Sequence, residues 1–247
     1  MASSTAKASR SAKIVPLETG DGPIGKVLRV ATEPVPSSDP RPAVDEWGRD
    51  AKFVDAFAAI ARLRWDVSVG GQQLLPKGGP ALIVINTRPL ALTPVLTALA
   101  LSEALDRPVR FVGRPDVVPF GPLLRRIGGL LAIPEEVGGA LRAGELVLMG
   151  AEATRNPRHA GKVDHQLVAA AIREQAPVHV AATLSTMFSR NARIEVTAAL
   201  RSGRNRRRGP LADIELAEQA QRRLQDLLDE IGGTRTGVPV LGWFGEG

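Results

Sequence analysis

Five consecutive apolar residues, Ala81–Ile85, constrain the fold of this chain more than any other feature of its sequence. A strand with one face in water alternates apolar and polar residues, whereas a strand buried on both faces is apolar throughout. This run therefore predicts a central strand in a sheet that is covered on both sides. Asn86 and Thr87 follow it directly. Polar residues at the end of such a strand are candidates for a functional site.

Strand-like and helix-like segments alternate along the rest of the chain. Short apolar or alternating runs predict further strands at 65–69, 109–112, 130–133, 145–149, 177–183 and 193–200. Helical spacing of apolar residues predicts helices at 51–64, 93–105, 120–127, 137–142, 163–175 and 211–231. This alternation indicates an α/β fold, with a mostly parallel sheet flanked by helices. Ligands of such folds gather beyond the carboxyl ends of the strands, which points to residues 86–89 and 150–155.

The sequence predicts one folded domain, over residues 43–231. Residues 1–42 are rich in Ser, Pro, Gly and Ala and carry few large apolar side chains, so we expect a mobile N-terminal arm. Residues 232–247 form a C-terminal tail with Trp243 and Phe244 after flexible glycines. This aromatic pair could insert at a lipid interface, bind a partner or pack back on the domain.

Composition narrows the class of protein. The chain has no cysteine, which excludes disulfides, thiolate metal sites and cysteine nucleophiles. It has no apolar run approaching the roughly 18 residues of a membrane span and no signal-peptide pattern. We therefore expect a cytoplasmic protein, either free or peripheral at the inner face of the membrane. The net charge of +6 indicates an anionic partner, and the lack of tyrosine disfavours nucleic acid, whose single strands stack on aromatic side chains.

Residues 201–209, RSGRNRRRG, concentrate five arginines in nine residues. At about 1 kcal/mol per basic residue, such a segment can bind an anionic membrane surface. We expect the membrane-binding residues to be Arg204, Arg206, Arg207 and Arg208, and Arg125 and Arg126 could add to that surface. The alternatives are a solvated loop between the last strand and the last helix, or a segment that binds nucleic-acid phosphates.

Four segments carry a resemblance to a known family: WDVSVGGQQLLPKGGPALIVIN, GRPDVVPFGPLLRRIGGLLAIPEE, ALRAGELVLMGAEATRNP and APVHVAATLS. Their order and spacing resemble the four motif regions of the glycerolipid acyltransferases of the lysophosphatidate acyltransferase family, across roughly residues 43–231. Glu152, Thr154 and Arg155 match that family's Pro-Glu-Gly-Thr-Arg core. The resemblance implies an acyltransferase-like α/β fold that handles acyl-CoA or acyl-carrier protein and a glycerol-type acceptor.

The catalytic pair of that family is missing. In the family, a histidine deprotonates the acceptor hydroxyl, and an aspartate after four intervening residues orients it. The matching positions here hold Thr87 and Leu92. A threonine hydroxyl cannot act as a base near pH 7, and leucine cannot orient one. The second motif also lacks its phosphate-binding arginine, because residues 127–141 contain none.

We therefore expect a pseudoenzyme that binds an acyl lipid or a protein partner at an anionic membrane surface, with Asn86, Glu152, Thr154 and Arg155 as its substrate-binding residues. One alternative is a weak or altered acyltransferase that uses acyl-CoA or acyl-carrier protein, with Glu152 and Arg155 near the acceptor. A second alternative is an electrostatic nucleic-acid binder. Glu152 and Arg155 could also form a structural ion pair or cap.

A further possibility is that a histidine elsewhere in the chain replaces the missing catalytic base. The three histidines are His159, His165 and His179. Each needs an orienting partner to replace the lost pair, and the alternative is that all three are surface or packed residues. No histidine or carboxylate spacing is typical of a metal site, so we expect neither a metal nor a cofactor.

Overall fold

The computed structural model describes residues 44–88, 92–114, 120–156, 158–185, 190–200 and 209–233. The arm predicted for residues 1–42 lies outside this part of the chain, as does the tail predicted for 232–247 except Gly232 and Gly233, which are helical. No helix among the described residues combines the length and the apolar character that crossing a bilayer requires.

The strands are β1 (Asp66–Gly70), β2 (Ala81–Ile85), β3 (Val109–Gly113), β4 (Gly129–Leu131), β5 (Leu146–Gly150), β6 (Val178–Ser185) and β7 (Asn191–Val196). The helices are α2 (Ala51–Arg64), the short 3-10 helix η1 (Gln72–Leu74), α3 (Thr93–Leu105), α4 (Gly121–Arg126), α5 (Pro134–Arg142), α6 (His165–Arg173) and α7 (Pro210–Gly233).

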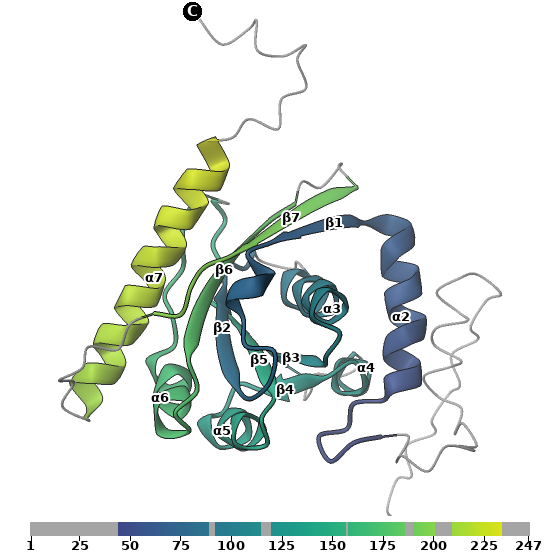
Figure 1. Cartoon of the computed structure of the whole chain (residues 1–247), viewed down its shortest axis with the longest axis horizontal. Helices are drawn as coiled ribbons and strands as arrows, with labels where there is room; N and C mark the ends of the chain where they lie inside the picture. The colour runs from purple at the N-terminus through teal and green to yellow at the C-terminus, as the bar shows by residue number, and fades with distance from the viewer. Residues whose placement is uncertain are drawn as a thin grey trace, which may run out of the picture. The chain divides into compact units, whose positions relative to one another are not determined.

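All these strands form one sheet in the order β1-β7-β6-β2-β5-β3-β4 (Figure 1). Strands β2 to β6 are parallel, β7 is antiparallel to β6, and β1 is parallel to β7. The predicted α/β class, a mostly parallel sheet flanked by helices, is confirmed. We call the side where the parallel strands begin the amino edge and the side where they end the carboxyl edge. Because β1 runs the other way, it begins at the carboxyl edge.

The central strand β2 is fully buried, as its sequence predicts. Leu82 and Val84 belong to a core cluster with side chains of α5, α6 and α7. Since successive side chains of a strand point to opposite faces, Ile83 and Ile85 point to the other face. That face lies toward α3 and α2 (Figure 1). Burying each large aliphatic side chain contributes about 1.5–3 kcal/mol, so the strand holds both layers together.

The amino edge is closed by the segment before α2 and a buried arginine. Arg110 on β3 is 1 % exposed, and its Nη2 donates to Asp45 Oδ2 at 2.6 Å and lies 3.5 Å from Glu145 Oε1. The other carboxylate oxygen of Asp45 accepts from the backbone N–H groups of Trp47 and Arg49. One aspartate therefore shapes the turn before α2 and compensates a charge buried in the sheet.

Asp50 joins the start of α2 to α4. Its Oδ1 caps the helix by accepting from the Phe53 N–H, and its Oδ2 accepts from Arg126 Nη2 at 2.7 Å. The Arg126 guanidinium also lies 4.5 Å from the centre of the Phe53 ring. Its neighbour Arg125 pairs with Glu136. Arg125 and Arg126 thus form internal ion pairs while their side chains stay 31 % and 19 % exposed, and that they add to a membrane-binding surface remains a prediction.

Replacing Asp45 by alanine leaves the Arg110 guanidinium buried with only the more distant Glu145. We expect Asp45→Ala to lower the free energy of unfolding by about 2–3 kcal/mol in urea denaturation. The matched control is Glu218→Ala, which removes an exposed pair with Arg222 at 3.6 Å and should change stability by roughly 0.5 kcal/mol or less. An equal loss of stability in the two variants would show that the Asp45–Arg110 ion pair contributes little.

Candidate functional site

Asn86 directly follows β2 at the carboxyl edge, and both polar atoms of its side-chain amide bond to the backbone of Thr183. Its Nδ2 donates to the Thr183 carbonyl at 2.9 Å, and its Oδ1 accepts from the Thr183 N–H at 2.7 Å. The side chain is buried and imitates a further backbone pair between β2 and β6. Asn86, expected to bind substrate, therefore uses both of its polar groups to hold the end of β2.

Thr87 follows and packs against the end of β5. Its Oγ1 donates to the Ala151 carbonyl at 2.5 Å, and its carbonyl accepts from the Thr154 N–H at 3.3 Å. Gly150 makes this packing possible, because a Cβ there would lie 2.3 Å from the Thr87 Cγ2. The hydroxyl thus acts as a donor to a neighbouring strand. Thr87 links β2 to β5 at the position where the resemblance implies a base.

Leu92, at the position where the resemblance implies the orienting aspartate, stands at the N-cap of α3. Helix N-caps favour side chains that accept a hydrogen bond from the first turn, and leucine has no such group. Its side chain is 50 % exposed. The position therefore lies at the carboxyl edge and presents only an apolar surface.

The loop after β5 carries Glu152, Thr154 and Arg155, the residues that match the Pro-Glu-Gly-Thr-Arg core (the third motif), and it lies at the same edge. The Glu152 N–H donates to the Lys162 carbonyl at 2.7 Å, and a Cβ on Gly161 would lie 1.8 Å from the Glu152 carbonyl oxygen. Thr154 Oγ1 lies 3.0 Å and 2.9 Å from the carbonyl oxygens of Asn156 and His159, to which it can donate. These contacts bring residues 152–156 and 158–162 together in a tight loop. The predicted binding residue Thr154 is engaged within it.

Glu152 and Arg155 are both exposed. In the part of the chain that the structure describes, no salt bridge or side-chain hydrogen bond joins either residue to another. The alternative of a structural ion pair is therefore not supported within that part. A carboxylate and a guanidinium at the carboxyl edge remain available to a ligand.

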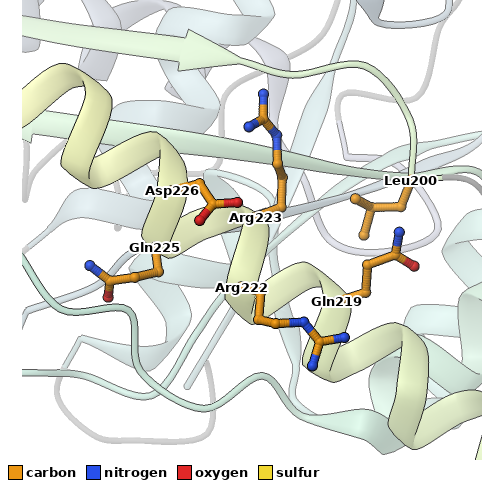
Figure 2. Close-up of a pocket in the computed structure, with 6 residues that line it drawn as sticks. All are labelled: Leu200, Gln219, Arg222, Arg223, Gln225 and Asp226. Atoms are coloured by element: carbon orange, nitrogen blue, oxygen red, sulfur yellow. The ribbon is translucent and has the colours of Figure 1, made fainter.

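A residue that the sequence gives no reason to single out, Gln225, ties this loop to α7. Its Oε1 accepts from the Ala160 N–H at 2.9 Å, and its Nε2 donates to the Arg158 carbonyl at 2.8 Å. Gln225 also lines an open pocket of about 390 Å³ (Figure 2). The other lining residues are Leu200, Gln219, Arg222, Arg223 and Asp226. Nothing in this set pairs a nucleophile with a base.

A narrow crevice lies between α3 and the sheet, beside the carboxyl edge. It is lined by Trp65, Val67, Thr93, Leu96, Thr97, Thr183, Ala192 and Ile194. The Thr97 and Thr183 hydroxyls bond to each other at 2.9 Å, so their polar groups are satisfied. The enclosed volume of about 10 Å³ is close to that of a single water probe. The crevice is mostly apolar and closed.

The arginines predicted to bind a membrane, Arg204, Arg206, Arg207 and Arg208, lie outside the described residues. Leu200 is the last described residue before them, and its N–H donates to the Val178 carbonyl at 2.7 Å. Val178 is the first residue of β6, so the chain leaves the described fold at the amino edge. The attachment point of this segment and Thr87 are therefore at opposite edges of the sheet.

The three histidines do not rebuild the missing pair. His179 is buried near the start of β6, where its Nδ1 lies 3.1 Å from the Thr197 carbonyl, and burial lowers its pKa. His159 is exposed in the loop after the third motif, and His165 begins α6. Among the described residues, no hydrogen bond or salt bridge joins these imidazoles to a carboxylate, and no group of three or more His, Asp or Glu side chains could hold a metal ion.

Comparison with known proteins defines the fold. No protein-family model matches the sequence, and neither does any curated protein. Among solved structures, the crystal structure of the 1-acyl-sn-glycerophosphate (LPA) acyltransferase PlsC from Thermotoga maritima is similar, with a TM-score of 0.57. The match covers 86 % of this chain and 90 % of that chain at 13 % identity. The fold is acyltransferase-like. At this identity the likeness concerns the backbone, and the roles of individual residues must be argued from geometry.

The bridge from Asn86 to β6 yields a stability prediction. Asn86→Ala leaves the buried N–H and C=O of Thr183 without partners, and each costs about 1–3 kcal/mol. We expect a loss of roughly 2–6 kcal/mol in the free energy of unfolding, with faster amide hydrogen exchange at Thr183. The control is Asn156→Ala, at an exposed position. Unchanged exchange at Thr183 in the Asn86 variant would refute the bridging role.

His179 yields a pH prediction. Its pKa is lowered in the folded chain, so below its ordinary value of about 6.5 the unfolded chain binds a proton that the folded chain does not. Stability should therefore fall as the pH drops from about 7.5 to about 5.5, by at most ~1.4 kcal/mol per pH unit from this residue. His179→Gln should lose less stability over that range in urea denaturation. Parallel curves would mean that His179 titrates normally in the fold.

Proposed function

We propose that this acyltransferase-like protein is a pseudoenzyme that binds an acyl lipid or a protein partner at an anionic membrane surface. One observation carries the proposal. At the carboxyl edge, the two positions that would hold a base and its orienting carboxylate present a hydroxyl that donates to Ala151 and an exposed leucine.

The chemistry explains why these substitutions matter. Transfer of an acyl group from a thioester to an alcohol requires removal of the alcohol's proton, and a positioned base contributes about 10²–10⁴-fold to such steps. The Thr87 hydroxyl already donates its proton to a carbonyl, and Leu92 offers no charge to stabilise an imidazolium. Neither position can perform its part.

The surroundings support a binding role. The crevice beside the carboxyl edge is lined mainly by apolar side chains, which suits an acyl chain. Its volume of about 10 Å³ is far below that of an acyl chain, so α3 would have to move away from the sheet to admit one. Glu152 and Arg155, exposed at the same edge, could contact a polar headgroup or a partner protein.

A second candidate is a weak or altered acyltransferase that uses acyl-CoA or acyl-carrier protein. The exposure of Glu152 and Arg155 favours it, because no described salt bridge occupies either side chain. A carboxylate free of partners could take the acceptor proton, although less effectively than an oriented imidazole.

The test is transfer of a labelled acyl group from acyl-CoA to lysophosphatidate by the purified chain, with mass spectrometry of lipid extracted from the same preparation. The Glu152→Ala variant and the double variant Thr87→His with Leu92→Asp are measured beside it. We expect no turnover by the unmodified chain, together with bound acyl lipid. Turnover that disappears in Glu152→Ala would refute the pseudoenzyme and establish the second candidate. Turnover by the double variant alone would show that these two positions account for the loss.

A further inference from the structure

The strand β1 is the outermost strand of the sheet, and its outer side, the side away from β7, carries unpaired backbone groups. The Asp66 N–H donates to the Arg190 carbonyl at 2.7 Å, so the backbone groups of Asp66 face β7. Successive residues of a strand direct their N–H and C=O groups to opposite sides, so those of Val67 and Val69 point away from β7. Among the described residues, no strand pairs with this outer side. It is therefore open to a further strand.

β1 lacks the features that usually prevent such pairing. The outermost strands of monomeric proteins are protected by proline, by lysine, by a bulge or by very short length. The strand at the other end of the sheet, β4, has only three residues. β1 has five residues, DVSVG, in unbroken register with β7, and its one charged side chain is that of Asp66 at its start. Nothing within β1 itself opposes a partner strand.

β1 is complementary to a second copy of itself. When two copies run antiparallel with Ser68 opposite Ser68, Val67 of each copy lies opposite Val69 of the other. The outward N–H and C=O groups of these two valines then bond to each other across the two copies. Both valine side chains are only partly buried in the single chain, and the cross-strand contact covers them further. This register satisfies the open backbone groups and buries apolar surface at the same time.

The charges agree with the same register. It places Asp66 opposite Gly70 of the second copy, so the two Asp66 carboxylates do not face each other. The Glu195 carboxylate lies over Gly70, since a Cβ there would be 2.3 Å from the Glu195 Oε2. Arg193 Nη2 lies 2.6 Å from the other carboxylate oxygen of Glu195, and the Arg193 side chain is 49 % exposed. Asp66 of one copy would thus meet an ion pair with an accessible guanidinium on the other.

Exposed apolar side chains stand at both ends of β1. Leu63, in the last turn of α2, is 75 % exposed, and Leu74, at the end of η1, is 44 % exposed. α2 leads directly into β1 (Figure 1), and Arg190 Nη2 donates to the Leu63 carbonyl at 2.7 Å. Antiparallel pairing sets the start of each strand beside the end of the other, so the end of α2 with Leu63 approaches η1 with Leu74 of the second copy. Apolar side chains that meet in this way are typical of an interface.

We propose that β1 is the interface of a symmetric dimer, in which two copies of this chain join their sheets antiparallel about Ser68. Because the same contact is made in both directions, the assembly closes at two copies. Residues opposite each other in a sheet share a face, so the α3 layers of both copies lie on one face of the continuous sheet. The proposal concerns assembly and goes beyond the proposed function, whose test does not depend on it.

The first experiment is disulfide cross-linking, because the chain contains no cysteine of its own. Three full-length variants, Ser68→Cys, Asp66→Cys and Leu211→Cys, replace exposed side chains and are treated with a mild oxidant. Opposite residues of an antiparallel pair that is not hydrogen-bonded lie about 4.5 Å apart at Cα, within the range that a disulfide spans. We expect a linked dimer of Ser68→Cys alone, because Asp66 faces Gly70 and Leu211 lies on α7. Equal cross-linking of all three variants, or of none, would overturn the proposal.

A charge exchange at Ser68 tests the same register without oxidation. Ser68→Lys and Ser68→Glu each place like charges opposite each other, and we expect each to raise the dissociation constant of the dimer roughly fivefold in sedimentation equilibrium. An equal mixture of the two should form a mixed dimer at least as tight as that of the unmodified chain. Circular dichroism melting verifies that every variant is folded.

Two results of these measurements would contradict the dimer. A dimer that both charged variants leave unchanged would mean that the chain associates through another surface. An unmodified chain that stays monomeric would overturn the proposal and would favour a different protein, or another segment of this chain, as the partner of β1.

Discussion

The two hydrogen bonds between Asn86 and the backbone of Thr183 hold the carboxyl edge together. β2 ends at Ile85, while β6 continues to Ser185, so beyond Ile85 the longer strand has lost its backbone partner. The amide of Asn86 supplies a donor and an acceptor in its place. Thr87, the next residue, bonds to Ala151 at the end of β5 through its hydroxyl. Its carbonyl accepts from the Thr154 N–H in the loop after β5. Asn86 thus fixes the end of β2, while Gln225 and the Glu152 N–H hold the loop after β5.

The two edges of the sheet are stabilised by different interactions. At the amino edge, a buried guanidinium on β3 is compensated by Asp45, and the same carboxylate orders the turn before α2. Burial of a charge makes such an arrangement specific, because a single lost partner leaves the charge uncompensated. At the carboxyl edge, the polar groups of Asn86 and Thr87 bond to neighbouring strands, and the side chain of Leu92 is half exposed. The amino edge thus compensates a buried charge, whereas the carboxyl edge uses its polar side chains to join β2 to β5 and β6.

Sequence patterns predict the fold well, because a strand that is buried on both faces, such as β2, is apolar at every position. They also place Thr87, Leu92 and Glu152 at one edge, since strand ends in a parallel sheet must meet there. The partners of individual side chains are beyond such patterns. Arg110 reads as a polar residue in a strand, yet it is buried because Asp45, 65 residues earlier, approaches it. Gln225 reads as a surface residue of an amphipathic helix, yet it holds a loop 65 residues away.

The tight loop of the third motif changes what the survival of a motif signifies. Thr154 closes the turn through the carbonyl groups of Asn156 and His159, and Gly161 permits the backbone to pass close to Glu152. These contacts serve the fold whether or not the loop takes part in a reaction. A short run of residues that matches an enzyme's signature can therefore be required by the backbone of the loop itself, and its presence alone does not establish the reaction.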